Sequence, residues 1–384
     1  MPISAIVAGF VAILVGYSGS AAIVFQAAKS AGADAAMIGS WMGALGLGMG
    51  ITCIGLSLRY RAPVITAWST PGAAVLVTAL SGVDMSAAVG AFLFCGALIL
   101  LSGVTGWFER IMDRVPLQIA SALLAGVLAR FGMDVFVAME SELPLVGLMF
   151  LSYLLIKRMS SRYVVIAVFV IGILLSVLFD LFDFESVSLA ITSPIFTLPT
   201  FDLQVILGAG LPLFIVTMAS QNIPGVAVLR TFGYGRVPVS PILTATGATT
   251  LLLAPFGGFA YNLAAITAAI CAGPDAEPDP DRRYLAGVAA GVFYLIAGLF
   301  GATITALFIA FPKALVFAIA GIALLGTITT GLKQAMAEER WREPALKPYL
   351  VPLPGVHLFG IGSASGGLVA GGLAMGLLGR GRLT

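Results

Sequence analysis

Two short stretches of this sequence, residues 63–82 and 254–273, have the composition of ligand-binding breaks inside an otherwise apolar chain. Each begins with an extended run containing an aromatic residue, passes a polar break, and ends in a short helix of small residues closed by glycine. About ten residues at 1.5 Å rise cover about 15 Å, half of a ~30 Å hydrocarbon core. A helix starting in mid-membrane exposes unpaired N–H groups and the positive end of its dipole. Two such starts facing each other predict an anion site that needs no full positive charge.

The residues at each break fit helix starts. Pro71 suits the first helical position, and Ser69 or Thr70 suits the N-cap before it. In the second stretch, Asn262 is expected to cap a helix that begins there. Extended backbone beside such starts is tolerable in a membrane only where protein or a wet cavity satisfies its polar groups. The alternative is that each stretch is a kinked helix with incidental polar residues.

Aromatic residues accompany both breaks. Trp68 lies in the first stretch, and Phe259 and Tyr261 lie in the second. We align the two stretches so that Phe259 corresponds to Trp68. These rings add flat apolar surface beside the two helix starts. The combination suits a small organic anion, particularly an aromatic carboxylate.

Side-chain amides supply further candidate contacts. Gln26 lies in the first apolar span, and Gln221 and Asn222 lie just before Pro224 in a later one. Gln26 and Gln221 are 195 residues apart (221 − 26), close to the separation of the two breaks. Amides inside a membrane are costly unless partnered, so they either face substrate or join helices together.

Composition places the chain in a membrane. Hydrophobic residues make up 59% and charged residues 10% of the sequence, and mean hydropathy is +1.06. A soluble domain carries about 25% charged residues. The net charge of +2 gives no reason to expect nucleic acid as a partner. The three cysteines, Cys53, Cys95 and Cys271, lie in apolar runs and fit buried hydrophobic positions better than disulfides or metal ligands.

Apolar windows bounded by charges, proline and glycine predict an all-α polytopic protein with fourteen spans. They cover residues 3–28, 35–58, 63–81, 85–107, 115–139, 143–157, 163–182, 203–222, 237–254, 255–273, 284–310, 314–336, about 343–354, and 356–378. Spans 3 and 10 are the broken ones. The thirteenth is the weakest because four prolines crowd it, and the acidic segment 183–201 links the two sets of seven.

Basic residues give an independent check on this order. With the N-terminus in the cytoplasm, nearly all Lys and Arg fall inside, and only Lys29 and Lys313 fall outside. Both termini are then cytoplasmic. An odd number of spans per half puts the halves in opposite orientations, as a 7+7 inverted repeat whose broken spans meet near the middle of the bilayer.

Several sequence blocks resemble the benzoate membrane-transport (BenE-type) family. They are VGYSGSAAIVFQAA, PVITAWSTPGAA, ASQNIPG, YNLAAITAAICAG and AEERWREPAL, and the likeness covers nearly the whole chain. The resemblance implies benzoate:proton symport across the bacterial inner membrane. The wider superfamily, with nucleobase permeases and sulfate/chloride-type anion transporters, implies core and gate domains. The core would hold residues 1–114 and 201–311, and the gate residues 115–200 and 312–384. Assembly as a homodimer stays open.

One departure from the superfamily bears on the substrate. Nucleobase permeases carry a glutamate in an A-E-H motif where this chain has Ser220-Gln221-Asn222, and another in span 10 where it has Tyr261. A carboxylate would repel an anionic ligand, so an amide and a phenol fit an anion. The replacement also removes the obvious proton carrier, so proton coupling is implied by the resemblance alone.

We therefore expect a secondary transporter of benzoate or a similar aromatic carboxylate, without cofactor or metal. A nucleobase permease, an inorganic-anion transporter and a passive channel are the alternatives. An enzyme would need clustered nucleophiles, bases or metal ligands in the spans. His357 is the only histidine, and no phosphate loop is present. The expected substrate-binding residues are Gln26, Trp68, Ser69, Thr70, Gln221, Asn222, Tyr261 and Asn262.

Overall fold

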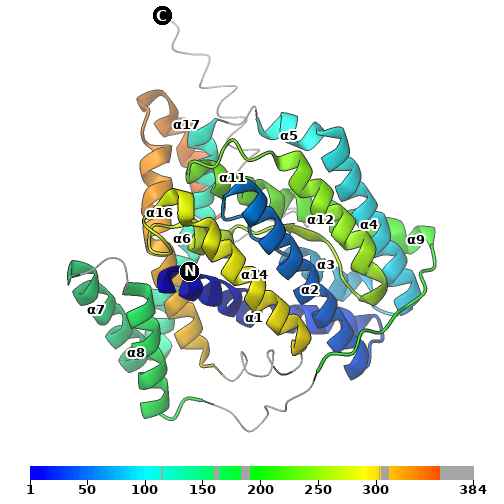
Figure 1. Cartoon of the computed structure of the whole chain (residues 1–384), viewed down its shortest axis with the longest axis horizontal. Helices are drawn as coiled ribbons and strands as arrows, with labels where there is room; N and C mark the ends of the chain where they lie inside the picture. The colour runs from blue at the N-terminus through cyan, green and yellow to red at the C-terminus, as the bar shows by residue number, and fades with distance from the viewer. Residues whose placement is uncertain (114–115, 160–163, 183–190, 302, 304–310, 355–384) are drawn as a thin grey trace, which may run out of the picture.

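A computed structural model describes residues 1–113, 116–159, 164–182, 191–301, 303 and 311–354, and the described chain is mostly helical (Figure 1). The first half holds the following elements: α1 (Ile3–Ser30), α2 (Ala35–Tyr60), β1 (Thr66–Trp68), α3 (Thr70–Ala79), α4 (Met85–Thr105), α5 (Trp107–Met112), α6 (Leu117–Ser141), α7 (Leu143–Met159) and α8 (Val164–Leu178).

The second half begins with one long, irregular helix. It consists of α9 (Leu203–Val205), the π-helical turn η1 (Ile206–Gly210), α10 (Leu211–Thr217), a second π-helical turn η2 (Met218–Asn222) and α11 (Ile223–Thr231). It continues with α12 (Val239–Leu253), η3 (Ala254–Phe256), β2 (Tyr261–Leu263), α13 (Ile266–Ala272), η4 (Pro280–Arg282), α14 (Tyr284–Leu299), α16 (Lys313–Ala335) and α17 (Glu339–Leu350).

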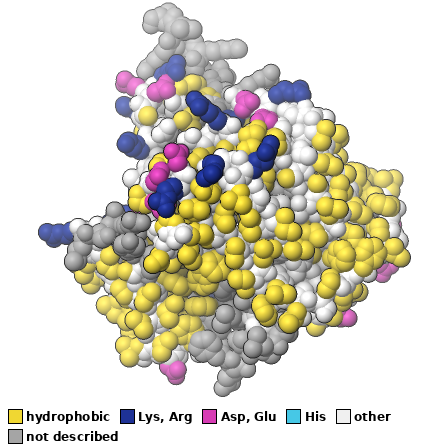
Figure 2. Space-filling view, viewed as in Figure 1, with side chains coloured by type: hydrophobic (Ala, Val, Ile, Leu, Met, Phe, Trp, Pro, Cys, Tyr) yellow, Lys and Arg dark blue, Asp and Glu magenta, His cyan; other side chains and the backbone are white. Residues whose placement is uncertain are grey.

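The surface of the protein fits a hydrocarbon environment. Among the described residues, five helices are long and apolar enough to cross a membrane: Ala35–Tyr60, Met85–Thr105, Leu203–Thr231, Val239–Phe256 and Lys313–Ala335. Large apolar side chains such as Leu101 and Val104 point outward from them. Figure 2 shows a broad apolar face, with Lys and Arg gathered toward the end where α5 and α17 lie. The chain is a membrane protein, as its composition predicts.

Both predicted breaks are present as strands followed by short helices. β1 and β2 pair antiparallel, with Thr66 opposite Leu263, Ala67 opposite Asn262 and Trp68 opposite Tyr261. This two-stranded ribbon satisfies backbone groups that would otherwise be unpaired in the middle of the protein. α3 starts at Thr70, one residue before the predicted first position at Pro71, but α13 starts at Ile266. The predicted helix start at Asn262 is wrong because that residue belongs to β2.

The helices form two packed groups (Figure 1). α1, α2, α3, α4, α12, α13 and α14 pack around the ribbon, and α6, α7, α8, α16 and α17 pack together beside them. Glycine permits the closest approach in the first group: a Cβ on Gly46 of α2 would overlap Gly298 of α14. Small residues at such helix crossings allow the two backbones to approach each other closely. The three cysteines are free and buried.

Two predicted spans differ from the structure, and a third is not described. Span 8 was expected to end at residue 222 before Pro224, but its helix continues to Thr231. Proline lacks an N–H and clashes with the carbonyl four residues earlier. For Pro224 that carbonyl belongs to Ser220 in η2, and the wider π-turn accommodates the clash without ending the helix. The described part of the predicted span 13 is the amphipathic helix α17, whose 12 residues are fewer than the ~20 of a regular spanning helix and include Pro344 and Pro348. The predicted span 14, residues 356–378, and His357 lie outside the described residues.

The segment that links the halves is described from residue 191. It runs extended across the ends of the first helix group, where Thr192 N–H donates to Leu299 O, Thr197 N–H to Pro255 O, and Thr200 N–H to Ser86 O. The link is therefore fastened to the helices around the ribbon.

Candidate functional site

A cavity of about 370 Å³ lies where the two broken spans meet. Its described lining comes from α1, α2, β1, α3, η2, α13 and α14, all within or beside the helix group around the ribbon. The size is at the lower end of the range for small-molecule sites. None of the described lining residues carries a formal charge. The cavity therefore suits a small ligand that is bound by dipoles and apolar surface.

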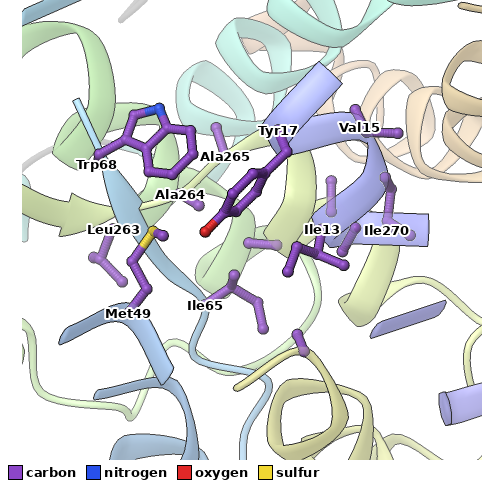
Figure 3. Close-up of a cluster of buried hydrophobic side chains, with 14 of the residues drawn as sticks. Ile13, Val15, Tyr17, Met49, Ile65, Trp68, Leu263, Ala264, Ala265 and Ile270 are labelled. Carbon is purple, nitrogen blue, oxygen red and sulfur yellow. The ribbon is translucent and has the colours of Figure 1, made fainter. Parts of the chain in front are cut away.

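Aromatic rings form one wall of the cavity. The Tyr17 and Trp68 rings meet edge to face with centroids 4.8 Å apart, and the Tyr17 and Tyr294 centroids are 6.2 Å apart. Figure 3 shows Tyr17 beside Trp68 and above Met49, which also lines the cavity. Edge-to-face and tilted rings of this kind are the usual environment for a further aromatic ring.

Trp68 is held in place from α1. Its indole Nε1–H donates to Ser20 Oγ at 3.0 Å, and the Ser20 hydroxyl donates to Gly16 O at 2.6 Å. The Trp68 N–H is therefore already used, and this residue offers a ligand its ring face and no donor.

The start of α3 lies at the cavity through Thr70 and Pro71. Ser69 is buried behind them, and its Oγ accepts from Gly72 N–H at 3.1 Å. This hydrogen bond confirms Ser69 as a local cap and directs its side chain to the helix. Thr70 is thus the polar residue of this start that faces the cavity.

The start of α13 is built differently. Ala264, Ala265, Ile266 and Thr267 line the cavity, and the N-cap residue Ala265 has no side chain that can cap the first turn. The N–H groups of that turn have no helical carbonyl behind them. Ala264 N–H is already bonded to Ile65 O at 2.9 Å. The second break therefore presents backbone donors that no side chain of its N-cap satisfies.

Asn262 lies behind the cavity and caps no helix. It is fully buried in β2, its Nδ2 donates to Ala260 O at 2.8 Å, and its Oδ1 has no partner among the described residues. Asn262 does not line the cavity. The sequence predicts an N-cap here because asparagine favours both helix caps and irregular extended turns, and its type alone does not distinguish the two.

The two predicted amides of span 8 are neighbours in the π-turn η2, but their side chains have different surroundings. Gln221 is half-buried and lines the cavity. Asn222 is fully buried: its Oδ1 accepts from Leu263 N–H at 2.9 Å, and its Nδ2 lies 3.2 Å from Met218 Sδ. Gln221 can reach a ligand, whereas Asn222 joins η2 to β2.

Tyr261 and Gln26 also lie outside the cavity lining. The Tyr261 hydroxyl donates to Ala44 O at 2.6 Å, and its ring packs so closely on Gly48 that a Cβ there would overlap it. Gln26 is an exposed residue of α1. Of the eight predicted residues, Trp68, Thr70 and Gln221 meet at the cavity.

Sequence reasoning did not single out Tyr294, Met49 and Thr267 as site residues, although all three line the cavity. Tyr294 is one aromatic residue in an apolar helix, and its sequence context predicts only a buried packing role. Thr267 follows the break by five residues, so only the true start of α13 would have placed it at the site.

Charged groups near the site lie at the far end of α13. Arg283 is buried and donates to Ala272 O at 3.0 Å and to Glu277 O at 2.7 Å. Burial raises the pKa of Asp275 in the same loop, although the charges of Lys157 and Arg283 oppose this. A cation at the C-terminus of α13 complements the negative end of its dipole and leaves the cavity end free.

Known proteins are similar to this chain over nearly its whole length. The chain matches the BenE family, described as benzoate membrane transport protein, over residues 1–377. It is 47% identical over 373 residues to the inner membrane protein YdcO of Escherichia coli (strain K12), covering 97% of this chain and 95% of that protein. It is 39% identical over 372 residues to the benzoate membrane transport protein of Acinetobacter baylyi (strain ATCC 33305 / BD413 / ADP1), covering 97% and 94%.

Solved structures of transporters are also similar to this chain. The transmembrane domain of a cyanobacterial bicarbonate transporter, BicA, has a TM-score of 0.49 at 14% identity, covering 96% of this chain and 97% of that one. SLC26A9 has a TM-score of 0.48 at 12% identity, covering 96% and 65%.

The sequence relatives define a membrane transport protein and not an enzyme. The chain belongs to the benzoate membrane transport protein family, which confirms the family predicted from its motifs.

Proposed function

We propose that this protein is a secondary transporter of benzoate or a similar small aromatic carboxylate, working by proton-coupled uptake. The observation that carries the proposal is the cavity itself: an aromatic wall and two short-helix starts surround a space whose described lining holds no carboxylate. The relative from Acinetobacter baylyi is named for benzoate transport.

The ligand would use the two kinds of surface together. Its ring would pack against Tyr17, Trp68 and Tyr294, and its carboxylate would accept hydrogen bonds from the α3 and α13 starts and from the Gln221 amide. Hydrogen bonds to a charged group are worth about 1.5–3 kcal/mol each. Backbone dipoles fixed by the ribbon would bind the anion without a buried counter-ion, which would itself be costly to desolvate.

The predicted fourteen-span inverted repeat remains part of this proposal. The central ribbon pair, Ala67 and Asn262, is 195 residues apart (262 − 67), the same offset as Gln26 and Gln221 (221 − 26). Equal offsets at two places support a repeat, and antiparallel pairing suits opposite orientations. Transport would then move the core, 1–114 with 201–311, against the gate, 115–200 with 312–384. Both termini would be cytoplasmic, in the inner membrane of a bacterium.

The position of the gate supports motion of this kind. The cavity lining comes from the first helix group, and the second group packs beside it through contacts of α16 with α1 and α13 and of α6 with α11. A rigid group that shifts along this boundary would expose the cavity to one side at a time. No acidic residue belongs to the described lining of the cavity, and the proposal assigns the proton to no particular residue.

Two measurements test the proposal. Calorimetry on purified protein should give tighter binding of benzoate than of uracil or sulfate, and a preference for uracil would contradict it. In proteoliposomes, an inward proton gradient should concentrate labelled benzoate above its equilibrium level. Benzoate that only equilibrates, despite tight binding, would indicate a passive channel.

A further inference from the structure

Gly16 lines the cavity from the middle of α1, and the proposed function gives it no role. The residue is partly exposed, although its neighbours on α1, Val15 and Tyr17 (Figure 3), are both buried. Because α1 packs against α3, α13 and α14, all of which contribute to the cavity, the exposed face of Gly16 is the one that borders this space.

Packing against the described helices does not require glycine at this position. A Cβ built on Gly16 would meet Thr267 Cγ2 and Tyr294 OH, each at 3.5 Å, which is ordinary van der Waals contact, and no other described neighbour comes within 4 Å. Gly9 lies two turns earlier on the same face of α1, and its Cβ would come within 2.6 Å of Ala290 N in α14. Gly9 therefore permits a close helix contact, whereas Gly16 borders open space.

The backbone of α1 does not require glycine there either. Gly16 lies inside the regular helix Ile3–Ser30. Glycine in a helix interior is less favourable than alanine because it loses more conformational freedom on folding. Neither packing nor backbone conformation among the described residues explains a glycine at position 16. What the missing methyl group provides is volume in the cavity.

The cavity is larger than a bare aromatic ring needs. A space of about 150 Å³ is enough to hold benzene, and this cavity has about 370 Å³. A carboxylate at the helix starts would take only part of the difference. Beside Gly16 the nearest atoms include the Thr267 methyl carbon, and Val15 and Met49 add apolar lining. A small apolar group on the ring, such as methyl or chloro, suits such surroundings, since a polar group would give up hydrogen bonds to water.

We infer that Gly16 is a specificity-determining residue whose missing side chain makes room for a small apolar ring substituent, so that the substrates include methyl- or chloro-substituted benzoates. This inference rests on the proposed function, because the aromatic wall and the helix starts must still hold the ring and the carboxylate. It assigns the size limit of the site to the backbone of α1.

Calorimetry on the full chain with benzoate and with 2-, 3- and 4-methylbenzoate tests the inference. At least one methylbenzoate should bind the parent protein as tightly as benzoate or up to about fourfold tighter, the gain expected from burying one methyl group. Gly16→Ala should raise the Kd of that isomer relative to the Kd of benzoate about five- to a hundredfold, because two methyl groups then compete for one space. Gly55→Ala adds a methyl group on α2 with no neighbour within 4 Å and is the matched control, which should keep the parental ratio.

Thermal unfolding separates this role from packing. Gly16→Ala should unfold at the parental temperature or above it, whereas Gly9→Ala should unfold at a lower temperature because its Cβ meets the backbone of α14. A fall for Gly16→Ala as large as that for Gly9→Ala would make Gly16 a packing glycine and overturn the inference.

Two binding results would also overturn it. Every methylbenzoate could bind the parent protein far more weakly than benzoate, or the ratio of Kd values could be the same in Gly16→Ala as in the parent. In both cases benzoate still binds, and the proposed function stands. Failure of benzoate to bind the parent protein would remove the proposed function and the role of Gly16 together.

Discussion

The side-chain oxygen of Asn222 accepts a hydrogen bond from the backbone N–H of Leu263 at 2.9 Å. This contact joins the π-turn of span 8 to the strand of span 10. Gln221, the neighbour of Asn222, reaches the cavity from that turn, and α13 follows directly from that strand. One amide therefore joins two sides of the cavity without lining it.

Loss of this amide should weaken binding indirectly. Asn222→Ala leaves the buried Leu263 N–H unsatisfied, which costs about 1–3 kcal/mol. We expect a lower unfolding temperature and about tenfold weaker benzoate binding, measured by calorimetry in detergent. Gln26→Ala, an exposed change on α1, is the control and should match the parent. Parental affinity in a folded Asn222→Ala protein would show that η2 holds its place without this bond.

A carboxylate at position 221 should make binding depend on pH. Gln221→Glu places a negative charge at the cavity, where it repels the ligand carboxylate. We expect benzoate binding at pH 7 to weaken at least tenfold and to recover as pH falls and the new side chain takes up a proton. Gln26→Glu adds the same charge outside the cavity and should leave the pH profile unchanged. Equal profiles for the two variants would mean that Gln221 does not approach the ligand.

The breaks were predictable from sequence because proline, glycine and polar residues interrupt long apolar runs there. In a membrane, such interruptions indicate broken helices, since the lipid cannot satisfy the backbone groups that they leave unpaired. The start of α13 was not predictable. Asn262 has the chemistry of a cap, and its role in β2 depends on a partner strand 195 residues away. Gln26 shares a repeat offset with Gln221, but an offset does not fix which face of a helix a side chain occupies. The π-turn at Met218–Asn222 changes that face in span 8.

Glu109 supports the start of α12 from a different helix. Its two carboxylate oxygens accept from Val239 N–H and Ser240 N–H, each at 2.9 Å. Burial favours the neutral acid, but the hydrogen bonds from Ser240 and Val239 and the charge of Arg230 outweigh it and lower the pKa of Glu109. A carboxylate with a lowered pKa stabilises the fold above its ordinary pKa, and that stability is lost as pH falls through the lowered value.

Removing this charge should therefore destabilise the protein near neutral pH. Glu109→Gln weakens a helix cap worth about 0.5–2 kcal/mol. We expect a lower unfolding temperature at pH 7, and a difference from the parent that shrinks once pH falls below about 4.3, the ordinary pKa of glutamate. Glu343→Gln, which removes an exposed ion pair with Lys347, is the matched control and should have little effect at any pH. A pH-independent difference for Glu109→Gln would contradict the capping role.

Helix contact in the first group should be sensitive to one methyl group. Gly46→Ala would place a Cβ against the Gly298 backbone, which cannot move aside as a side chain would. Overpacking of this kind costs about 1–3 kcal/mol, so the unfolding temperature should fall. Gly55→Ala lies on the same helix with open space around the new Cβ and should be tolerated. Similar unfolding temperatures for the two variants would show that α2 and α14 separate easily.

The burial of Cys53, Cys95 and Cys271 makes the parent protein a natural background for thiol labelling. A membrane-impermeant maleimide should find no native cysteine at the surface among the described residues. A single cysteine placed at Thr70 would then be the reactive thiol, and its labelling from one face of a vesicle would report which side of the membrane the cavity faces. Slower labelling of the same thiol after addition of benzoate would show that the ligand covers position 70.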